Sequence, residues 1–410
     1  MKSLLACFVC GCIAPLGGCG DDPITPPPLT PIQGRIEDTD GQPVPGVIVL
    51  VGDNSTVTSD AEGSFRVEKV ASTYDVALLF DSTEARFYAG ITRRDPFFRV
   101  PFRISPWSSA TIRGTVPPAP GKTTRLYFAP SLTPAATANP DDGSFQQTIG
   151  WYAPGPTVSG TLYVFRWPVG ADGLPAEYDG FASRDLVLTA GSSIVQEFAI
   201  AEFTDPLQAQ CSGTVTIPSG YELQSIGLRM RLGVESFWLF SQSRRAVPGS
   251  SFEYILPVVQ DAVFEIEAFA SLGGHHTILH RNAITPPAAG IVLELPAAPQ
   301  IVEPPQGASN VDDSTVFRWT EGGGTGPYLV AINIYGKSDF VLFLHGTSIR
   351  MADLSVYGLG LPAGSACAWN VYQLFPLSSL DDMLTPIHRT ALESEYGDAH
   401  SNEYMFTTKP

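Results

Sequence analysis

A short pattern of residues occurs three times in this chain and constrains the fold more than any other feature. Each occurrence has a Gly inside an apolar segment and, further along, a tight turn ending in Phe that opens another apolar segment. The occurrences are IQGRI with GSF (32–65), IRGTV with GSF (112–145) and SGTV with GSSF (212–252). Apolar segments of this length, separated by Gly and Pro turns, predict β-strands. The chain is therefore expected to build the same β-structure three times.

The spacing within the pattern supports tandem copies. The same interval separates Gly34 from Gly63 and Gly114 from Gly143, whereas the third interval is longer and predicts an insertion within 236–247. Equivalent apolar strands follow at 74–80, 161–167 and 263–269. Repetition on this scale indicates tandem domains, each with its own core, rather than a solenoid of small repeats. The phenylalanines that follow the turns are expected in these cores: Phe65, Phe145 and Phe252.

The first round carries a recognisable set of turn residues, namely Gly34, Gly41, Pro43, Gly46, Asp60, Gly63 and Phe65. With this set it resembles the carboxypeptidase regulatory-like module, a small β-sandwich of the prealbumin kind. The resemblance implies a module found on many surface and secreted proteins that mostly does no chemistry. We expect three such sandwiches, at 32–105, 106–204 and 205–298, of which the third is divergent.

The pattern changes after a Pro-rich joint at 297–305. Strands are predicted at 316–319, 328–334, 366–372 and 404–407. Through Trp319, Tyr328, Leu361, Trp369, Val371 and Phe406, residues 299–410 resemble the fibronectin type III sandwich, although Ala366-Cys367-Ala368 stand where that family usually has a Tyr. The resemblance implies a fold and no ligand.

Composition agrees with an all-β chain of tandem sandwiches in a row, with few helices. The 410 residues are 44% hydrophobic and only 16% charged, with 39 Gly and 36 Pro, as expected for many short strands joined by turns. The net charge of −17 disfavours nucleic acid as a partner, because the phosphate backbone would be repelled.

The first residues have the features of a targeting segment. Lys2 precedes an apolar stretch at 4–16 that is too short and too broken to span a membrane comfortably. Leu16-Gly17-Gly18-Cys19 then resembles the lipobox of bacterial lipoproteins, which implies cleavage of a 1–19 signal peptide and a lipid on Cys19; the alternative is an ordinary secretory signal. Residues 20–31 are Pro-rich, so they are expected to form an extended tether that holds the first domain roughly 30 Å from its anchor.

The sequence contains little that indicates a catalytic or a metal-binding site. His275, His276 and His280 are expected on a strand, where His276 and His280 would share a face but lie about 13 Å apart, too far to chelate one ion. We therefore interpret them as surface or turn histidines. No Gly-x-Ser-x-Gly nucleophile elbow occurs. Cys211 and Cys367, the cysteines outside the leader, are interpreted as small buried side chains, with a disulfide between them as the alternative. The prediction is no catalytic residue, no metal and no cofactor.

Two places remain as candidate binding sites. Trp151 and Tyr152 lie beside Gly150 and Pro154 in a predicted loop, where exposed aromatic rings would suit a glycan. Residues 374–402 form an unusually long connection between the last two strands, with a short helix expected after Ser379. Its polar residues are the candidate recognition set: Asp381, Asp382, His388, Arg389, Glu393, Glu395, Asp398 and His400.

The function expected from these observations is non-enzymatic. The chain is predicted to be a lipoprotein of the bacterial cell envelope, at the outer membrane or cell surface, acting as a spacer, an adhesion module or a protein-interaction module. The alternative is a glycan-binding accessory protein of a polysaccharide-capturing system. The expected partners are the membrane, through the N-terminal lipid, and either another envelope protein or an extracellular glycan.

Overall fold

The structure is a computed structural model, and it describes residues 29–410 except 53–54, 81–83, 102–103, 130, 134, 153–154, 171–173, 233–234, 244–250, 336–337, 356, 358 and 387–394. Within this part, the protein is all-β and consists of tandem β-sandwiches, as predicted. Cys19 and most of the predicted tether lie outside the described residues.

The first sandwich, here called unit 1, contains seven described strands. They are β1 (Thr30–Glu37), β2 (Ile48–Val51), β3 (Ser55–Thr58), β4 (Ser64–Val70), β5 (Tyr74–Leu79), β6 (Glu84–Ile91) and β7 (Phe97–Arg99). One sheet has the order β4-β1-β7, with β1 antiparallel to β4 and parallel to β7. The other runs β3-β2-β5-β6. The two sheets enclose the apolar side chains that alternate along each strand.

The next two sandwiches, unit 2 and unit 3, repeat this topology strand for strand. Unit 2 comprises β8 (Trp107–Thr115), β9 (Lys122–Ala129), β10 (Ala136–Thr137), β11 (Ser144–Tyr152), β12 (Thr157–Pro168), β13 (Gly180–Thr189) and β14 (Ser193–Glu197), followed by a 3₁₀ turn at Ile200–Glu202. Unit 3 comprises β15 (Leu207–Thr216), β16 (Glu222–Leu232), β17 (Glu235–Ser243), β18 (Ser251–Val258), β19 (Ala262–Leu272), β20 (His275–Ile284) and β21 (Ala288–Glu294). The sheets are ordered β11-β8-β14 with β10-β9-β12-β13, and β18-β15-β21 with β17-β16-β19-β20. The longer interval of the third round is explained by the longer strands β16 and β17.

The repeated Gly and Phe of the sequence pattern face each other across one pair of strands in each unit. Gly34 is opposite Phe65, Gly114 is opposite Phe145, and Gly213 is opposite Phe252. The three phenylalanines are buried, which confirms their predicted place in the core. In unit 1 the ring lies directly over the glycine: a Cβ at Gly34 would stand 2.2 Å from Cζ of Phe65. Only a residue without a side chain fits there.

The C-terminal unit is a different sandwich. Its strands are β22 (Ile301–Glu303), β23 (Ala308–Val311), β24 (Val316–Trp319), β25 (Tyr328–Ile334), β26 (Ser338–Leu344), β27 (Ser348–Arg350), β28 (Ala366–Phe375), β29 (Glu395–His400) and β30 (Tyr404–Thr408), with short helices α1 (Met351–Ser355) and α2 (Leu380–Met383). A β22-β24-β27 sheet packs on a sheet in which β25 lies between β26 and β28. Trp319, Trp369 and Phe406 are buried in the core between them.

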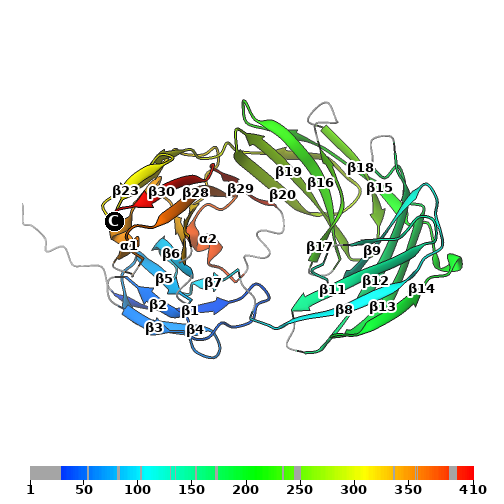
Figure 1. Cartoon of the computed structure of the whole chain (residues 1–410), viewed down its shortest axis with the longest axis horizontal. Helices are drawn as coiled ribbons and strands as arrows, with labels where there is room; N and C mark the ends of the chain where they lie inside the picture. Colours follow the sequence, from blue (N-terminus) through cyan, green and yellow to red (C-terminus); the bar gives the residue numbers. More distant parts are fainter. Residues whose placement is uncertain are drawn as a thin grey trace, which may run out of the picture.

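The units are joined through their sheets, which the sequence did not predict. Strand β26 pairs in parallel with β6 of unit 1, and β29 pairs antiparallel with β20 of unit 3. A 14-stranded sheet therefore runs from unit 3 through the C-terminal unit into unit 1. Figure 1 shows the result: the first and last parts of the described chain lie side by side, and the four units form a closed arrangement.

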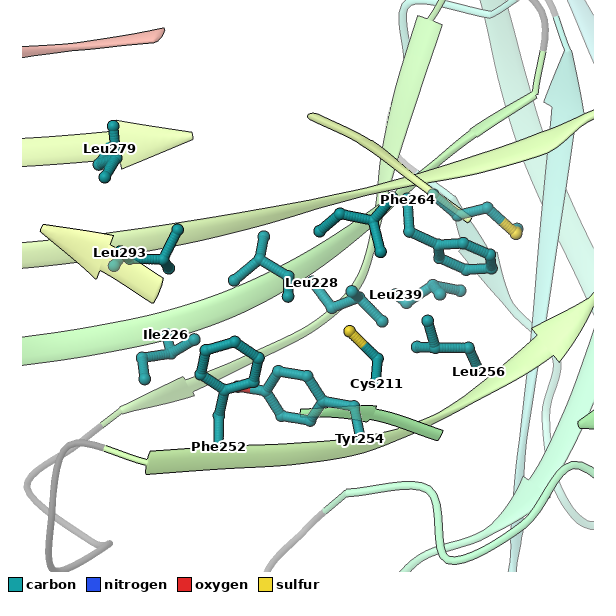
Figure 2. Close-up of a cluster of buried hydrophobic side chains, with 14 of the residues drawn as sticks. Cys211, Ile226, Leu228, Leu239, Phe252, Tyr254, Leu256, Phe264, Leu279 and Leu293 are labelled. Carbon is teal, nitrogen blue, oxygen red and sulfur yellow. The ribbon is translucent and has the colours of Figure 1, made fainter. Parts of the chain in front are cut away.

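The buried clusters of side chains do not all coincide with the four units. The core of unit 3 lies between its two sheets, with Cys211 and Phe252 from one sheet facing Leu228 and Phe264 from the other (Figure 2). The same buried cluster extends to Phe375 of the C-terminal unit and to Tyr127 and Phe165 of unit 2. By contrast, the cluster built around Ile112 and Phe145 consists of unit 2 residues alone.

Candidate functional site

The long connection predicted to recognise a partner contacts two other units of the same chain. We call residues 376–403, between β28 and β30, the C-terminal insert. It carries α2, which lies beside β6 of unit 1, and then β29, which lies beside β20 of unit 3 (Figure 1).

Helix α2 docks on unit 1. As predicted, Ser379 caps the helix: its hydroxyl accepts a hydrogen bond from the backbone N–H of Asp382, whose carboxylate accepts one from the N–H of Ser379. Leu380 and Leu384 are buried in the core of unit 1. The short helix is thus held by apolar side chains that belong to the neighbouring sandwich.

A carboxylate fixes this contact. Asp381 accepts hydrogen bonds from the backbone N–H groups of Thr92 (3.1 Å) and Arg93 (3.2 Å), and from the hydroxyl of Thr92. The backbone N–H of Phe97 also donates to the carbonyl of Leu384, at 2.9 Å. These bonds run between segments nearly three hundred positions apart, which is why sequence reasoning took Asp381 for a free recognition residue.

Strand β29 docks on unit 3. It pairs with β20 from His276 opposite His400 to Arg281 opposite Glu395. Arg281 Nη1 lies 2.5 Å from Glu395 Oε2, and the ring of Tyr396 stacks flat on His280, with centroids 4.3 Å apart. The two ends of the C-terminal insert therefore connect unit 1 and unit 3.

These contacts change the interpretation of the candidate recognition set. Asp381 and Glu395 bind other parts of this chain, and Asp382 serves the cap of α2, where hydrogen bonds from Ser378 and Ser379 lower the pKa of its carboxyl. His388, Arg389 and Glu393 lie outside the described residues. Recognition of an external partner by this segment stays a prediction.

The face of unit 3 that borders β29 carries a buried charged cluster. Glu265 and Glu267 alternate with buried apolar residues of β19, so both point to the face opposite the core. His280 of β20 stands opposite Glu267, and its Nδ1 lies 2.7 Å from Glu265 Oε1 and 3.5 Å from Glu267 Oε2. Arg229 of β16 completes the cluster through Nη2, 2.8 Å from Glu267 Oε2.

The prediction that His280 is a surface or turn histidine is wrong. Its side chain is buried within the continuous sheet, because β29 covers what would otherwise be an edge strand. One sequence signal could have indicated the cluster. Glu265 and Glu267 alternate along β19, and the hairpin that follows puts His280 opposite Glu267. Burial raises the pKa of Glu267, and it raises the pKa of Asp398, on β29, to about 6.

A second group of rings lies further along the paired strands β20 and β29. The rings of His276 and His400 are 4.9 Å apart, and Tyr372 stacks on His400. Burial and the neighbouring histidine lower the pKa of His400 and of His275. Only His276 and His400 of these three imidazoles have their rings directly against each other in the described structure.

The two aromatic candidates of unit 2 differ in their exposure to solvent. Trp151 does not lie in an exposed loop: it belongs to β11 and is buried in the core of unit 2, so the expectation for this residue is wrong. Tyr152 is partly exposed and meets the ring of Trp107 edge-on, with centroids 5.0 Å apart. Trp107 is 51% exposed, and it covers Gly150, where a Cβ would stand 2.0 Å from Cη2 of the Trp107 ring.

The outer face of this sheet is polar beside the aromatic pair. Since Ala110 and Ile112 of β8 point into the core, the alternate residues Ser109, Thr111 and Arg113 point outward with Trp107. A shallow groove crosses the far end of the same sheet, lined among others by Arg113, Asn139, Gln146 and Glu197.

The two cysteines are free and buried, in agreement with the preferred interpretation. Burial raises the pKa of the Cys211 thiol to about 11, which leaves little nucleophilic thiolate at neutral pH. Among the described residues, no helix is long and apolar enough to cross a membrane.

Comparisons with known proteins identify no family. No family model matches the chain, and no curated protein matches it. Among solved structures, the Bacillus anthracis TIE protein is 7% identical, with 65% of this chain and 51% of that chain covered and a TM-score of 0.17. The major pilin subunit BcpA of Bacillus cereus is 7% identical over 65% of this chain and 99% of that chain, with a TM-score of 0.16. The pilus adhesin SpaC of Lactobacillus rhamnosus GG is 10% identical over 77% of this chain and 43% of that chain, with a TM-score of 0.15.

Similarities of this size carry no argument about function. The chain spans about half the length of the Bacillus anthracis protein that it matches. The functional argument therefore rests on the residues and contacts described above.

Proposed function

We propose that this protein is a non-enzymatic lipoprotein of the bacterial cell envelope that acts as a rigid spacer or adhesion module. The observation that carries the proposal is the joining of the units: a continuous sheet and the C-terminal insert tie unit 1, unit 3 and the C-terminal unit together. A spacer or an adhesin benefits from such ties, because independent sandwiches on linkers would move relative to each other.

The proposed attachment to the membrane rests on the N-terminal residues of the sequence. A lipid on Cys19 followed by the Pro-rich segment 20–31 would hold the joined units at a short distance from the membrane. The acidic net charge of −17 would keep the body away from anionic lipid headgroups.

The anchor is tested by detergent phase partitioning of the full chain expressed in a bacterium. We expect the unaltered protein in the detergent phase and the Cys19→Ser variant in the aqueous phase, because the variant has no thiol to carry the lipid. A Ser replacement at Cys12, inside the apolar stretch, serves as the matched control and should still partition into detergent. Equal partitioning of the Cys19→Ser variant and the unaltered protein would contradict the proposal.

A second function, binding of a neutral glycan, is favoured by the exposed ring of Trp107. Its face offers the apolar surface on which a sugar ring stacks, and the hydroxyl groups of Ser109 and Thr111 lie on the same side of the sheet. Trp151, by contrast, is buried and contributes only to the core.

The glycan alternative is tested with a panel of neutral polysaccharides in affinity electrophoresis. We expect retardation by at least one polysaccharide, loss of retardation in Trp107→Ala, and unchanged retardation in Tyr335→Ala, which removes a 50% exposed ring from the C-terminal unit. Because Trp107 also covers Gly150, the melting temperature of the variant is measured alongside. Absence of retardation throughout the panel, or retardation that survives in a folded Trp107→Ala variant, would exclude this alternative.

A further inference from the structure

The charged cluster of unit 3 has the composition of a metal site. Glu265, Glu267 and His280 offer two carboxylate oxygens and one imidazole nitrogen, and these three atoms all lie within 4.8 Å of one another. The three residues are between 7% and 8% exposed. Carboxylate and imidazole ligands together suit Zn²⁺ and other divalent first-row transition metals.

The distances between the donor atoms also fit. In a tetrahedral site with bonds of about 2.0–2.1 Å, neighbouring ligand atoms stand about 3.3 Å apart. His280 Nδ1 lies 3.5 Å from the oxygen of Glu267 and 2.7 Å from that of Glu265, a hydrogen bond that would have to lengthen when both atoms bind the ion. Small side-chain rotations would place all three around one ion, and a water molecule would take the fourth position.

The sheet holds these donors in place. Glu265 and Glu267 are two apart on β19, and the β19–β20 register puts His280 directly opposite Glu267. The Tyr396 ring stacks on the imidazole with an interplanar angle of 3°, which restricts rotation of the His280 ring. Groups around a metal ligand that fix its orientation are a regular feature of metal sites.

The alternative is a network of ion pairs around Arg229. Its guanidinium lies 2.8 Å from Glu267 Oε2 and 3.6 Å from Glu265 Oε1. One permanent cation then faces two buried carboxylates, so the cluster has a net negative charge whenever His280 is neutral. Buried carboxylates without a full set of countercharges are costly, and a divalent cation would supply the missing charge. The oxygens that Arg229 contacts are the ones that face His280, so Arg229 would shift to the second oxygen of each carboxylate when the first binds the ion.

We propose that Glu265, Glu267 and His280 form a binding site for a divalent transition-metal ion of the Zn²⁺ type. The site lies where β29 of the C-terminal insert pairs with β20 of unit 3. The ion would therefore link β19 to β20 beside this pairing. The inference is independent of the proposed adhesion or spacer function.

The test uses residues 20–410, treated with a chelator and then titrated with Zn²⁺ in competition with a chromophoric chelator. We expect one ion per chain and a loss of affinity of about 100-fold or more in the Glu265→Gln, Glu267→Gln double variant. The His276→Gln, His400→Gln double variant is the matched control and should bind as before. Unchanged affinity in the first variant, or no stoichiometric binding to the unaltered protein, would overturn the proposal.

Arg229 distinguishes the metal site from the ion-pair network. If the cluster binds Zn²⁺, Arg229→Gln removes a cation that repels the ion, and the affinity should rise several-fold. If the cluster is only an ion-pair network, the variant loses stability and gains no affinity.

A spectroscopic measurement needs no variant and remains informative if the variants fail to fold. X-ray absorption of the Zn²⁺-loaded protein should show an oxygen and nitrogen environment with a single imidazole and no sulfur. Two or more imidazoles would assign the ion to the histidine group at His276 and His400 and overturn the proposal.

Discussion

The phenylalanine that follows each repeated turn packs into the core of its unit. Phe65, Phe145 and Phe252 are buried, and each stands opposite a glycine of the neighbouring strand. A large ring beside a residue without a side chain fills the space that the glycine leaves, and it fixes the register of the two strands. The ring lies within 3 Å of the Cβ position of the glycine in units 1 and 3, whereas at Gly114 of unit 2 the nearest atoms are the backbone of Gln196.

The Phe145→Ala variant tests this role in unit 2. We expect the free energy of unfolding of unit 2 to fall by about 3–5 kcal/mol, because the change removes a buried ring and leaves a cavity. Chemical denaturation measures the difference. Val187→Ala, at a 64% exposed position of the same unit, is the control and should change the free energy by no more than about 0.5 kcal/mol. A similar small effect for Phe145→Ala would show that its ring adds little to the core.

At the scale of elements, α2 shows how a short helix is stabilised by another unit. Four residues are too few for a stable helix in water. The Ser379 cap satisfies its first turn, while Leu380 and Leu384 enter the core of unit 1. The helix therefore depends on docking, to which the hydrogen bonds of Asp381 also contribute.

The Asp381→Ala variant should loosen α2 from unit 1. The backbone N–H groups of Thr92 and Arg93 lose a charged acceptor, and hydrogen bonds to charged groups contribute about 1.5–3 kcal/mol. Amide hydrogen exchange should accelerate at these two residues and at Phe97, whose N–H donates to Leu384. Glu62→Ala, in an exposed turn of unit 1, is the control. Unchanged exchange at all three amides would show that Leu380 and Leu384 suffice to hold the helix.

At the scale of the whole molecule, the units differ in how far they share cores. The buried cluster of unit 3 includes Phe375 and Ala399 of the C-terminal unit, and residues of the C-terminal insert enter unit 1. The buried cluster around Phe145 stays within unit 2. The unit 3 cluster also takes in Tyr127 and Phe165 of unit 2. Destabilisation of unit 3 should therefore spread to its neighbours.

Hydrogen exchange followed by mass spectrometry tests this difference. Phe264→Ala, in the core of unit 3, should raise exchange in β28 of the C-terminal unit as well as in β19, because Phe264 and Phe375 belong to one buried cluster. Phe145→Ala should raise exchange in β8 and β11, whose buried side chains belong to the cluster confined to unit 2, and should leave β28 unchanged. Exchange confined to unit 3 in the Phe264→Ala variant would mean that the units unfold independently despite the continuous sheet.

The sequence by itself determined what depends on residues close together in the chain or repeated along it. Period-two alternation identified the strands, the repeated Gly and Phe identified three equivalent sandwiches, and Ser379 with Asp382 identified a capped helix. Each of these features follows from local backbone geometry or from one recurring pair of strands.

The tertiary structure alone decided which strand edges are covered and by what. Trp151 follows Gly150 as a loop residue would, yet β11 continues through it and buries its ring. His280 is buried because β29, more than a hundred residues away, pairs with β20. Asp381 is bound because unit 1 presents two backbone N–H groups to it. Pairing between distant strands depends on backbone hydrogen bonds, which every residue except proline can form, so the pairing leaves little trace in the identity of the residues.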